Sequence, residues 1–173
     1  EAWAFLQIGA RRAGAGGAGG FPHRWAVLFL ASVGFWNFLG AGVFGFLINL
    51  PVVSYYEIGT HLTANHGHAS MMGVYGMLAM ALLVFCLRYL LRPEDWSERL
   101  VGFSFWALNL GLAWMVFVNL FPLGVLQLAD VVTHGYWHAR SLEFFETHAY
   151  IEWLRLPGDV VFIIGVLPLL YLT

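Results

Sequence analysis

The stretch HASMMGVYGMLAMALLVFCLRYLL, residues 68–91, decides what kind of fold this chain adopts. Its only charged residue is Arg88, close to its end. A helix needs about 20 predominantly apolar residues to cross roughly 30 Å of hydrocarbon. We therefore expect this stretch to form most of a transmembrane helix.

The composition of the whole chain also indicates a membrane protein. Of its 173 residues, 60% are hydrophobic and 10% are charged, whereas soluble domains carry about 25% charged residues. We interpret residues 1–24 as the end of a preceding helix followed by a Gly-rich cytoplasmic loop. The sequence predicts an all-α polytopic membrane protein, and residues 25–173 form one membrane domain. Its four transmembrane helices are expected at about 25–50, 62–91, 100–123 and 156–172.

Charge and cysteine content exclude some other classes. The net charge is −2, and the eight basic residues are all arginines scattered along the chain, so we expect no nucleic-acid partner. Cys86 is the single cysteine, which excludes an intrachain disulfide. We expect its thiol to be buried and inert. The chain begins with Glu1, without a signal-peptide pattern, and ends in an apolar run. We therefore expect it to be a segment of a longer protein.

The arginines predict the orientation of the four helices. Cytoplasmic loops of membrane proteins are enriched in basic residues. The arginines before the first helix and between the second and third outnumber the remaining pair, Arg140 and Arg155. We expect both ends of the segment and the loop around residues 92–99 to be cytoplasmic. The connections at 51–61 and at about 124–155 would then face outward.

Two histidines stand at the outer end of the second predicted helix, in TANHGHASMMG, residues 63–73. Each residue of an α-helix advances about 100°, so His66 and His68 should point about 200° apart. Imidazole is a good axial ligand for haem iron, and small residues such as Gly67 and Gly73 would let a flat macrocycle approach. An ionisable residue at membrane depth indicates function by default. The spacing alone leaves haem, copper and a proton path open.

Four longer stretches carry a family resemblance. INLPVVSYYEIGTHLTANHGHASMMGVYGMLAMALLVFCLRYL (48–90) resembles the ligand helix and preceding loop of quinol-dependent nitric oxide reductases, which belong to the haem–copper oxidase superfamily. FWALNLGLAWMVFVNLFPLGVLQLADVV (105–132), HARSLEFFE (138–146) and WLRLPGDVVFIIG (153–165) resemble the two helices that follow. The resemblance implies a C-terminal fragment of the catalytic subunit, with its four helices equivalent to the last four of a twelve-helix core.

The resemblance also implies cofactors and partners. His66 would be the proximal ligand of a high-spin haem b3, and His68 an axial ligand of a low-spin haem b. The reaction would reduce two nitric oxide molecules to nitrous oxide and water, with electrons from quinol. The ligands of a non-haem iron would come from missing N-terminal helices of the same subunit. The location would be a bacterial inner membrane. We expect the segment alone to have no turnover.

Two further residues near the pair have competing interpretations. Arg155 could bind haem propionates with charge-assisted hydrogen bonds, or it could be an interfacial arginine that reaches toward water. His61 precedes His68 by seven residues, a spacing that would place it on the same face. Thr60 is a plausible N-cap, which puts His61 in the first turn. An interfacial role for His61 is therefore favoured over a role as a ligand or in supporting a ligand.

The remaining polar residues carry weaker signals. His134 and His138 are four apart and could chelate a metal on a helix, but no glutamate occupies the zinc-protease position, so a metal site is not favoured. Glu57 and Asp159 could serve a proton path, although solvated loop carboxylates are the simpler interpretation. The asparagines of the spans should form interhelical hydrogen bonds. These are Asn49, Asn109 and Asn119.

The sequence leaves three alternatives to nitric oxide reduction. One is a fragment of an oxygen-reducing haem–copper oxidase, whose distinguishing crosslinked tyrosine would lie on a missing helix. Another is a small non-catalytic b-type cytochrome, which would need more suitably placed histidines. A four-helix transporter with a histidine relay should show repeats or interrupted helices, and the sequence shows no internal repeat.

Overall fold

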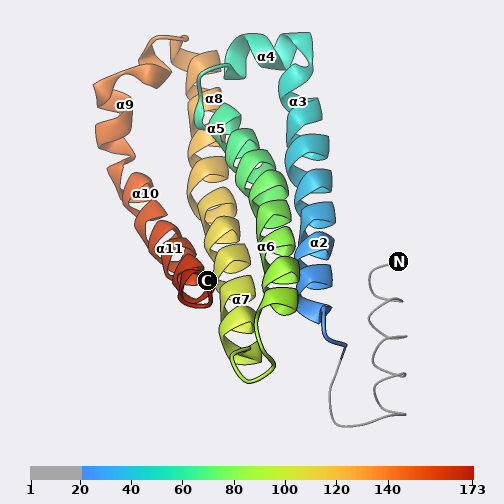
Figure 1. Cartoon of the computed structure of the whole chain (residues 1–173). Helices are drawn as coiled ribbons and strands as arrows, with labels where there is room; N and C mark the ends of the chain where they lie inside the picture. Colours follow the sequence, from blue (N-terminus) through green and yellow to red (C-terminus); the bar gives the residue numbers. More distant parts are fainter. Residues whose placement is uncertain (1–20) are drawn as a thin grey trace.

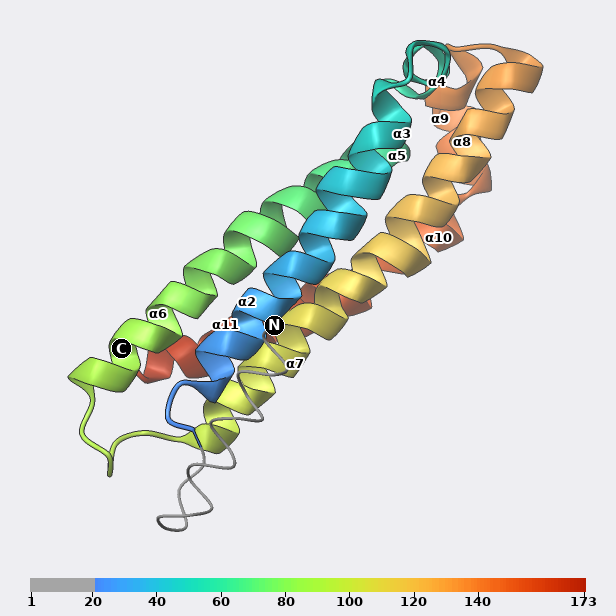
Figure 2. The same cartoon turned by 90° about the vertical axis from the view of Figure 1, so that its right-hand side faces the viewer.

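The computed structural model describes residues 21–173, which form four long helical rods lying side by side (Figures 1 and 2). The expected helix end and glycine loop before residue 21 lie outside the described residues. All four rods are long and apolar enough to cross a membrane. They cover Arg24–Asn49, His61–Leu90, Glu98–His134 and Ala149–Tyr171. The prediction of an all-α membrane protein with four candidate transmembrane helices is confirmed.

The rods are built from short segments joined end to end. The first contains α2 (Arg24–Trp36), η1 (Asn37–Phe44) and α3 (Gly45–Asn49). The second contains α5 (His61–Gly67), η2 (His68–Gly76) and α6 (Met77–Leu90). The third contains α7 (Glu98–Trp114), η3 (Met115–Leu120) and α8 (Phe121–His134). The segments η1, η2 and η3 are π-helical, and such wide turns occur frequently at functional sites.

Shorter elements connect the rods at one end of the molecule. Helix α4 (Pro51–Glu57) lies across that end between α3 and α5 (Figure 1). After α8 the chain continues through η4 (His138–Arg140) and α9 (Leu142–Thr147). The fourth rod follows as α10 (Ala149–Trp153) and α11 (Arg155–Tyr171). The two outward connections expected from the sequence therefore contain helices of their own.

The third helix is longer than expected, because it continues past Leu123 to His134. Pro122 does not end it, because it directly follows the π-helical η3 segment, and local π-helical turns accommodate proline within transmembrane helices. Gln127 is 1% exposed yet satisfied, because it bonds to His61 and to the Ala139 carbonyl. Tertiary partners thus satisfy a buried polar residue in this added part of the helix.

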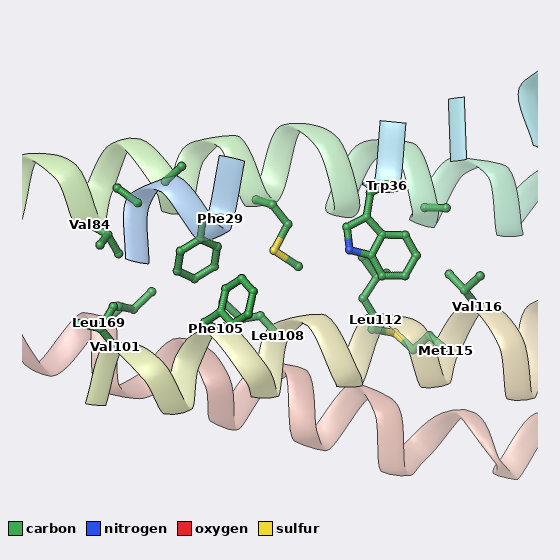
Figure 3. Packing of buried hydrophobic residues seen from close by; sticks show 14 of the residues in the cluster. Phe29, Trp36, Val84, Val101, Phe105, Leu108, Leu112, Met115, Val116 and Leu169 are labelled. Atoms are coloured by element: carbon green, nitrogen blue, oxygen red, sulfur yellow. The ribbon is translucent and has the colours of Figure 1, made fainter. Parts of the chain in front are cut away.

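The core lies where α2, α6, α7 and α11 meet (Figure 3). Phe29 is fully buried and packs edge-to-face on Phe105 with ring centroids 5.2 Å apart. Trp36 donates its Nε1–H to Asn109 Oδ1 at 3.0 Å, which joins the first and third rods. Large apolar side chains also cover the outside, among them Phe38, which is 71% exposed. An apolar exterior is what a lipid bilayer requires, so the bilayer is a partner of this chain.

The polar residues of the spans fulfil most of their expected roles. Asn109 and Asn119 form the predicted interhelical bonds, Asn119 through its Nδ2 to the Ile151 carbonyl at 2.7 Å. Asn49 instead donates to the Gly45 carbonyl of its own helix. Cys86 is exposed on α6, which corrects the expectation of a buried thiol.

Candidate functional site

The histidine pair lies at the junction of α5 and η2, in the half of the second rod that is nearer to α4 (Figure 1). Thr60 caps α5, since its side-chain oxygen accepts a hydrogen bond from the Leu62 N–H, as predicted. His66 contacts η1, and His68 contacts α11. The prediction that the two rings lie on different sides of one helix is confirmed.

Hydrogen bonds fix which nitrogen each imidazole presents. His66 Nδ1 lies 2.8 Å from the Gly40 carbonyl oxygen, and His68 Nδ1 lies 2.8 Å from the Ala64 carbonyl oxygen. A carbonyl can only accept, so each Nδ1 carries the proton and donates it. Each Nε2 then has its lone pair directed away from that bond. This arrangement is the one in which histidines serve as metal ligands.

Small residues lie beside both rings. An open hollow of about 360 Å³ lies beside His68, and Gly67, Met71 and Met72 help to line it. On the other side, a Cβ on Gly45 would lie 3.0 Å from His66 Cε1, so glycine at this position lets the ring approach the first rod closely. The surroundings can therefore accept a planar group against the His68 side.

Comparison with known proteins assigns the family. Residues 14–161 match the family model described as cytochrome c and quinol oxidase polypeptide I. The chain belongs to the haem–copper oxidase subunit I family. It is also 32% identical over 161 residues to a nitric oxide reductase subunit of Stutzerimonas stutzeri, a match that covers 87% of this chain and 32% of that protein. The chain thus spans about a third of the length of this relative.

Members of the haem–copper oxidase family bind haems, and the histidine pair fits such a group. The fit rests on the two Nε2 lone pairs set by carbonyl bonds and on the hollow beside His68. Imidazole nitrogen is an established axial ligand for haem iron. His66 and His68 each present an Nε2 lone pair of the kind that can hold haem iron.

Arg155 lies at the first position of α11, directly beside His68. Its NH2 group donates to His68 Nε2 at 3.1 Å, and its Nε donates to Asp159 Oδ2 at 3.1 Å. The sequence suggested either a propionate ligand or an interfacial arginine. The structure places the guanidinium next to His68 Nε2, so Arg155 belongs to the surroundings of this imidazole.

His61 points away from the pair. Its Nδ1 lies 2.8 Å from Gln127 Oε1, and its Nε2 lies 3.3 Å from Glu152 Oε1. Both ring nitrogens therefore have partners on α8 and α10. These contacts agree with the expectation that His61 is less suited as a ligand than the pair.

Glu57 differs from the expected solvated carboxylate, because it is only 2% exposed. Thr63 Oγ1 donates a hydrogen bond to its Oε2 at 3.0 Å. Burial raises the pKa of the Glu57 carboxyl, and the Thr63 bond, His66 and Arg140 partly oppose this shift. A protonatable group thus lies near His66. Asp159, in contrast, is half-buried and paired with Arg155.

His134 and His138 are brought together with Asp130, a residue that the sequence analysis did not single out. The signal was present as a spacing of four residues between Asp130 and His134 and four more to His138. The spacing suggests a helical pair of histidines, but the chain turns at Gly135 and His138 reaches Asp130 from η4. This cluster is separate from the His66–His68 pair.

Proposed function

We propose that this chain is part of the catalytic subunit of a quinol-dependent nitric oxide reductase. The reaction takes two nitric oxide molecules, two protons and two electrons to nitrous oxide and water. Quinol would supply the electrons. The subunit would lie in a bacterial inner membrane, with the loop between α6 and α7 in the cytoplasm.

The proposal rests mainly on His66 and His68, two histidines that could bind metal and that lie on different sides of one helix. One rigid helix could then hold an electron-donating haem and a reaction-site haem side by side. The relative from Stutzerimonas stutzeri is named as a nitric oxide reductase, which supports nitric oxide rather than oxygen as substrate.

Each residue of the pair has a proposed role. His66 would be the proximal ligand of the high-spin haem b3, and His68 an axial ligand of the low-spin haem b. When bound, the haems supply the electron transfer and the reduction chemistry. The Gly40 and Ala64 carbonyls orient the imidazoles and raise their basicity. Arg155 can turn from His68 to a haem carboxylate, for which its bidentate donors are suited.

Other parts of the enzyme would come from outside this segment. The resemblance implies that earlier helices supply the ligands of a non-haem iron and the second axial ligand of the low-spin haem. We therefore expect no turnover from residues 1–173 alone. Production of nitrous oxide by this purified segment would contradict that expectation.

The test is turnover of the complete subunit in detergent or liposomes with a reduced quinol. We expect one nitrous oxide molecule for every two nitric oxide molecules consumed. A His148→Ala variant should keep the turnover of the wild type, because His148 stacks on Phe144 and lies outside the site. Oxygen consumption without nitrous oxide formation would favour an oxygen-reducing oxidase. Haem binding without either activity would favour a non-catalytic b-type cytochrome.

A further inference from the structure

Asp130, His134 and His138 form a compact cluster at the end of the third rod. His134 Nδ1 lies 2.8 Å from Asp130 Oδ1, and His138 Nδ1 lies 2.7 Å from Asp130 Oδ2. One ligand atom from each residue can be chosen so that all lie within 4.8 Å of one another. The carboxylate thus lies between two imidazoles.

The backbone creates this cluster through a sharp turn. Asp130 and His134 are one turn apart on α8, on the same face. Gly135 then adopts φ of +100°, a conformation that side chains other than glycine rarely adopt. Its N–H makes the last helical bond of α8, to the Val131 carbonyl at 3.1 Å. The helix ends at this glycine. The turn brings His138 back over Asp130.

We propose that Asp130, His134 and His138 form a Zn²⁺ site with a fourth position open to water. Two imidazole nitrogens and one carboxylate oxygen suit zinc, whereas calcium and magnesium prefer oxygen ligands. Zinc would lie about 2.0–2.2 Å from each donor, so small movements of the side chains would form the site. Zinc would bind each imidazole at Nδ1, and the proton that this nitrogen now donates to the carboxylate would move to Nε2.

Exposure favours access of a cation. The side chain of Asp130 is 13% exposed, whereas those of His134 and His138 are 62% and 37% exposed. The acid is thus held in place beneath two accessible imidazoles.

The site would also connect to the helix that carries the histidine pair. Gln127 donates to the Ala139 carbonyl at 2.9 Å, directly after His138. Its Oε1 accepts from the His61 N–H at 2.7 Å, at the start of α5. A metal that joins α8 to η4 would therefore stabilise the contact between that turn and α5.

Zinc affinity of the full-length, haem-loaded protein tests the proposal, with Zn²⁺ alone as the probe in competition with a chromophoric chelator. The variants are Asp130→Asn, His134→Ala and His138→Ala. Loss of a residue that is hydrogen-bonded to a metal ligand weakens metal binding about 10–100-fold. Loss of a ligand itself should therefore weaken zinc binding at least about tenfold in each variant. His148→Ala is the matched control on the same side, with its Nδ1 bonded to the Phe144 carbonyl, and should bind as wild type.

A spectroscopic measurement keeps the test independent of variant folding. Copper(II) bound to the wild type should show electron paramagnetic resonance splittings from two imidazole nitrogens. Stoichiometric zinc binding, loss in the three variants and a two-nitrogen copper spectrum support the site. Absence of zinc binding by the wild type, unchanged binding in His134→Ala and His138→Ala, or a copper spectrum without two imidazole nitrogens would overturn it.

Discussion

Single hydrogen bonds decide which nitrogen the His66 and His68 rings present. Both Nδ1 atoms donate to carbonyl oxygens, so both Nε2 atoms keep their lone pairs. His68 Nε2 accepts a bond from Arg155. The proposed ligand roles thus depend on residues beyond the pair itself, and these can be changed one at a time.

Arg155→Leu should lower the midpoint potential of the low-spin haem in the complete subunit. Removing a positive charge near the iron stabilises the more positive oxidised state. Arg155→Lys keeps a charge and should change the potential less, although it loses the bidentate geometry. An optical redox titration measures both. Unchanged potentials in Arg155→Leu would remove this residue from the haem surroundings.

The raised pKa of the Glu57 carboxyl predicts that the stability of the fold depends on pH. Because burial raises its pKa in the folded state above the value of 4.5 in the unfolded state, folding favours the protonated form. Its contribution to stability is largest below pH 4.5 and is lost as pH rises through the raised pKa. Glutamine does not ionise, so Glu57→Gln should lose less thermal stability than the wild type as the pH rises from 4.5 through the raised pKa. Identical pH profiles of the variant and wild type in detergent would contradict the assignment.

Close helix approach is the main feature at the scale of elements. Helices α7 and α11 pack along each other, and a Cβ on Gly111 would lie 2.7 Å from the Phe162 backbone nitrogen. Small residues allow such approach in membranes. Backbone atoms of a packed helix cannot move away as a flexible side chain can, so this contact depends on glycine.

Gly111→Ala should therefore destabilise the chain by about 1–3 kcal/mol, as overpacking does. Gly34→Ala is the matched control, because its Cβ would meet nothing within 4 Å. Alanine also favours a helix over glycine by up to about 1 kcal/mol, so Gly34→Ala should be neutral or stabilising. Denaturant unfolding in detergent measures both variants. Equal effects of the two substitutions would show that close packing is not limiting.

The sequence predicted the rods better than their ends or their cross-links. The run around residues 68–91 is apolar over its whole length, so lipid burial alone identifies it. Gln127 and Asp130 lie on a helix because of partners on α5 and η4, and no local pattern contains those contacts. The opposite faces of His66 and His68 followed from helix geometry. The Arg155 contact required the fourth rod to be placed.

Orientation in the membrane is the prediction that belongs to the whole molecule. In a Cys86→Ser background, we expect Glu94→Cys in the α6–α7 loop to be labelled by an impermeant maleimide only after cells are permeabilised. Glu143→Cys in α9 should be labelled in intact spheroplasts. Both positions are exposed in the structure. The reverse labelling pattern would show that the arginine bias does not set the orientation.

Haem content and spin state of the complete subunit test the central claim most directly. We would record optical and low-temperature electron paramagnetic resonance spectra of the wild type, His66→Ala, His68→Ala and the His61→Ala control. The account predicts that His66→Ala loses the high-spin haem, His68→Ala loses the low-spin haem, and His61→Ala keeps both. Loss of the same haem in both variants of the pair, or of neither, would contradict the account.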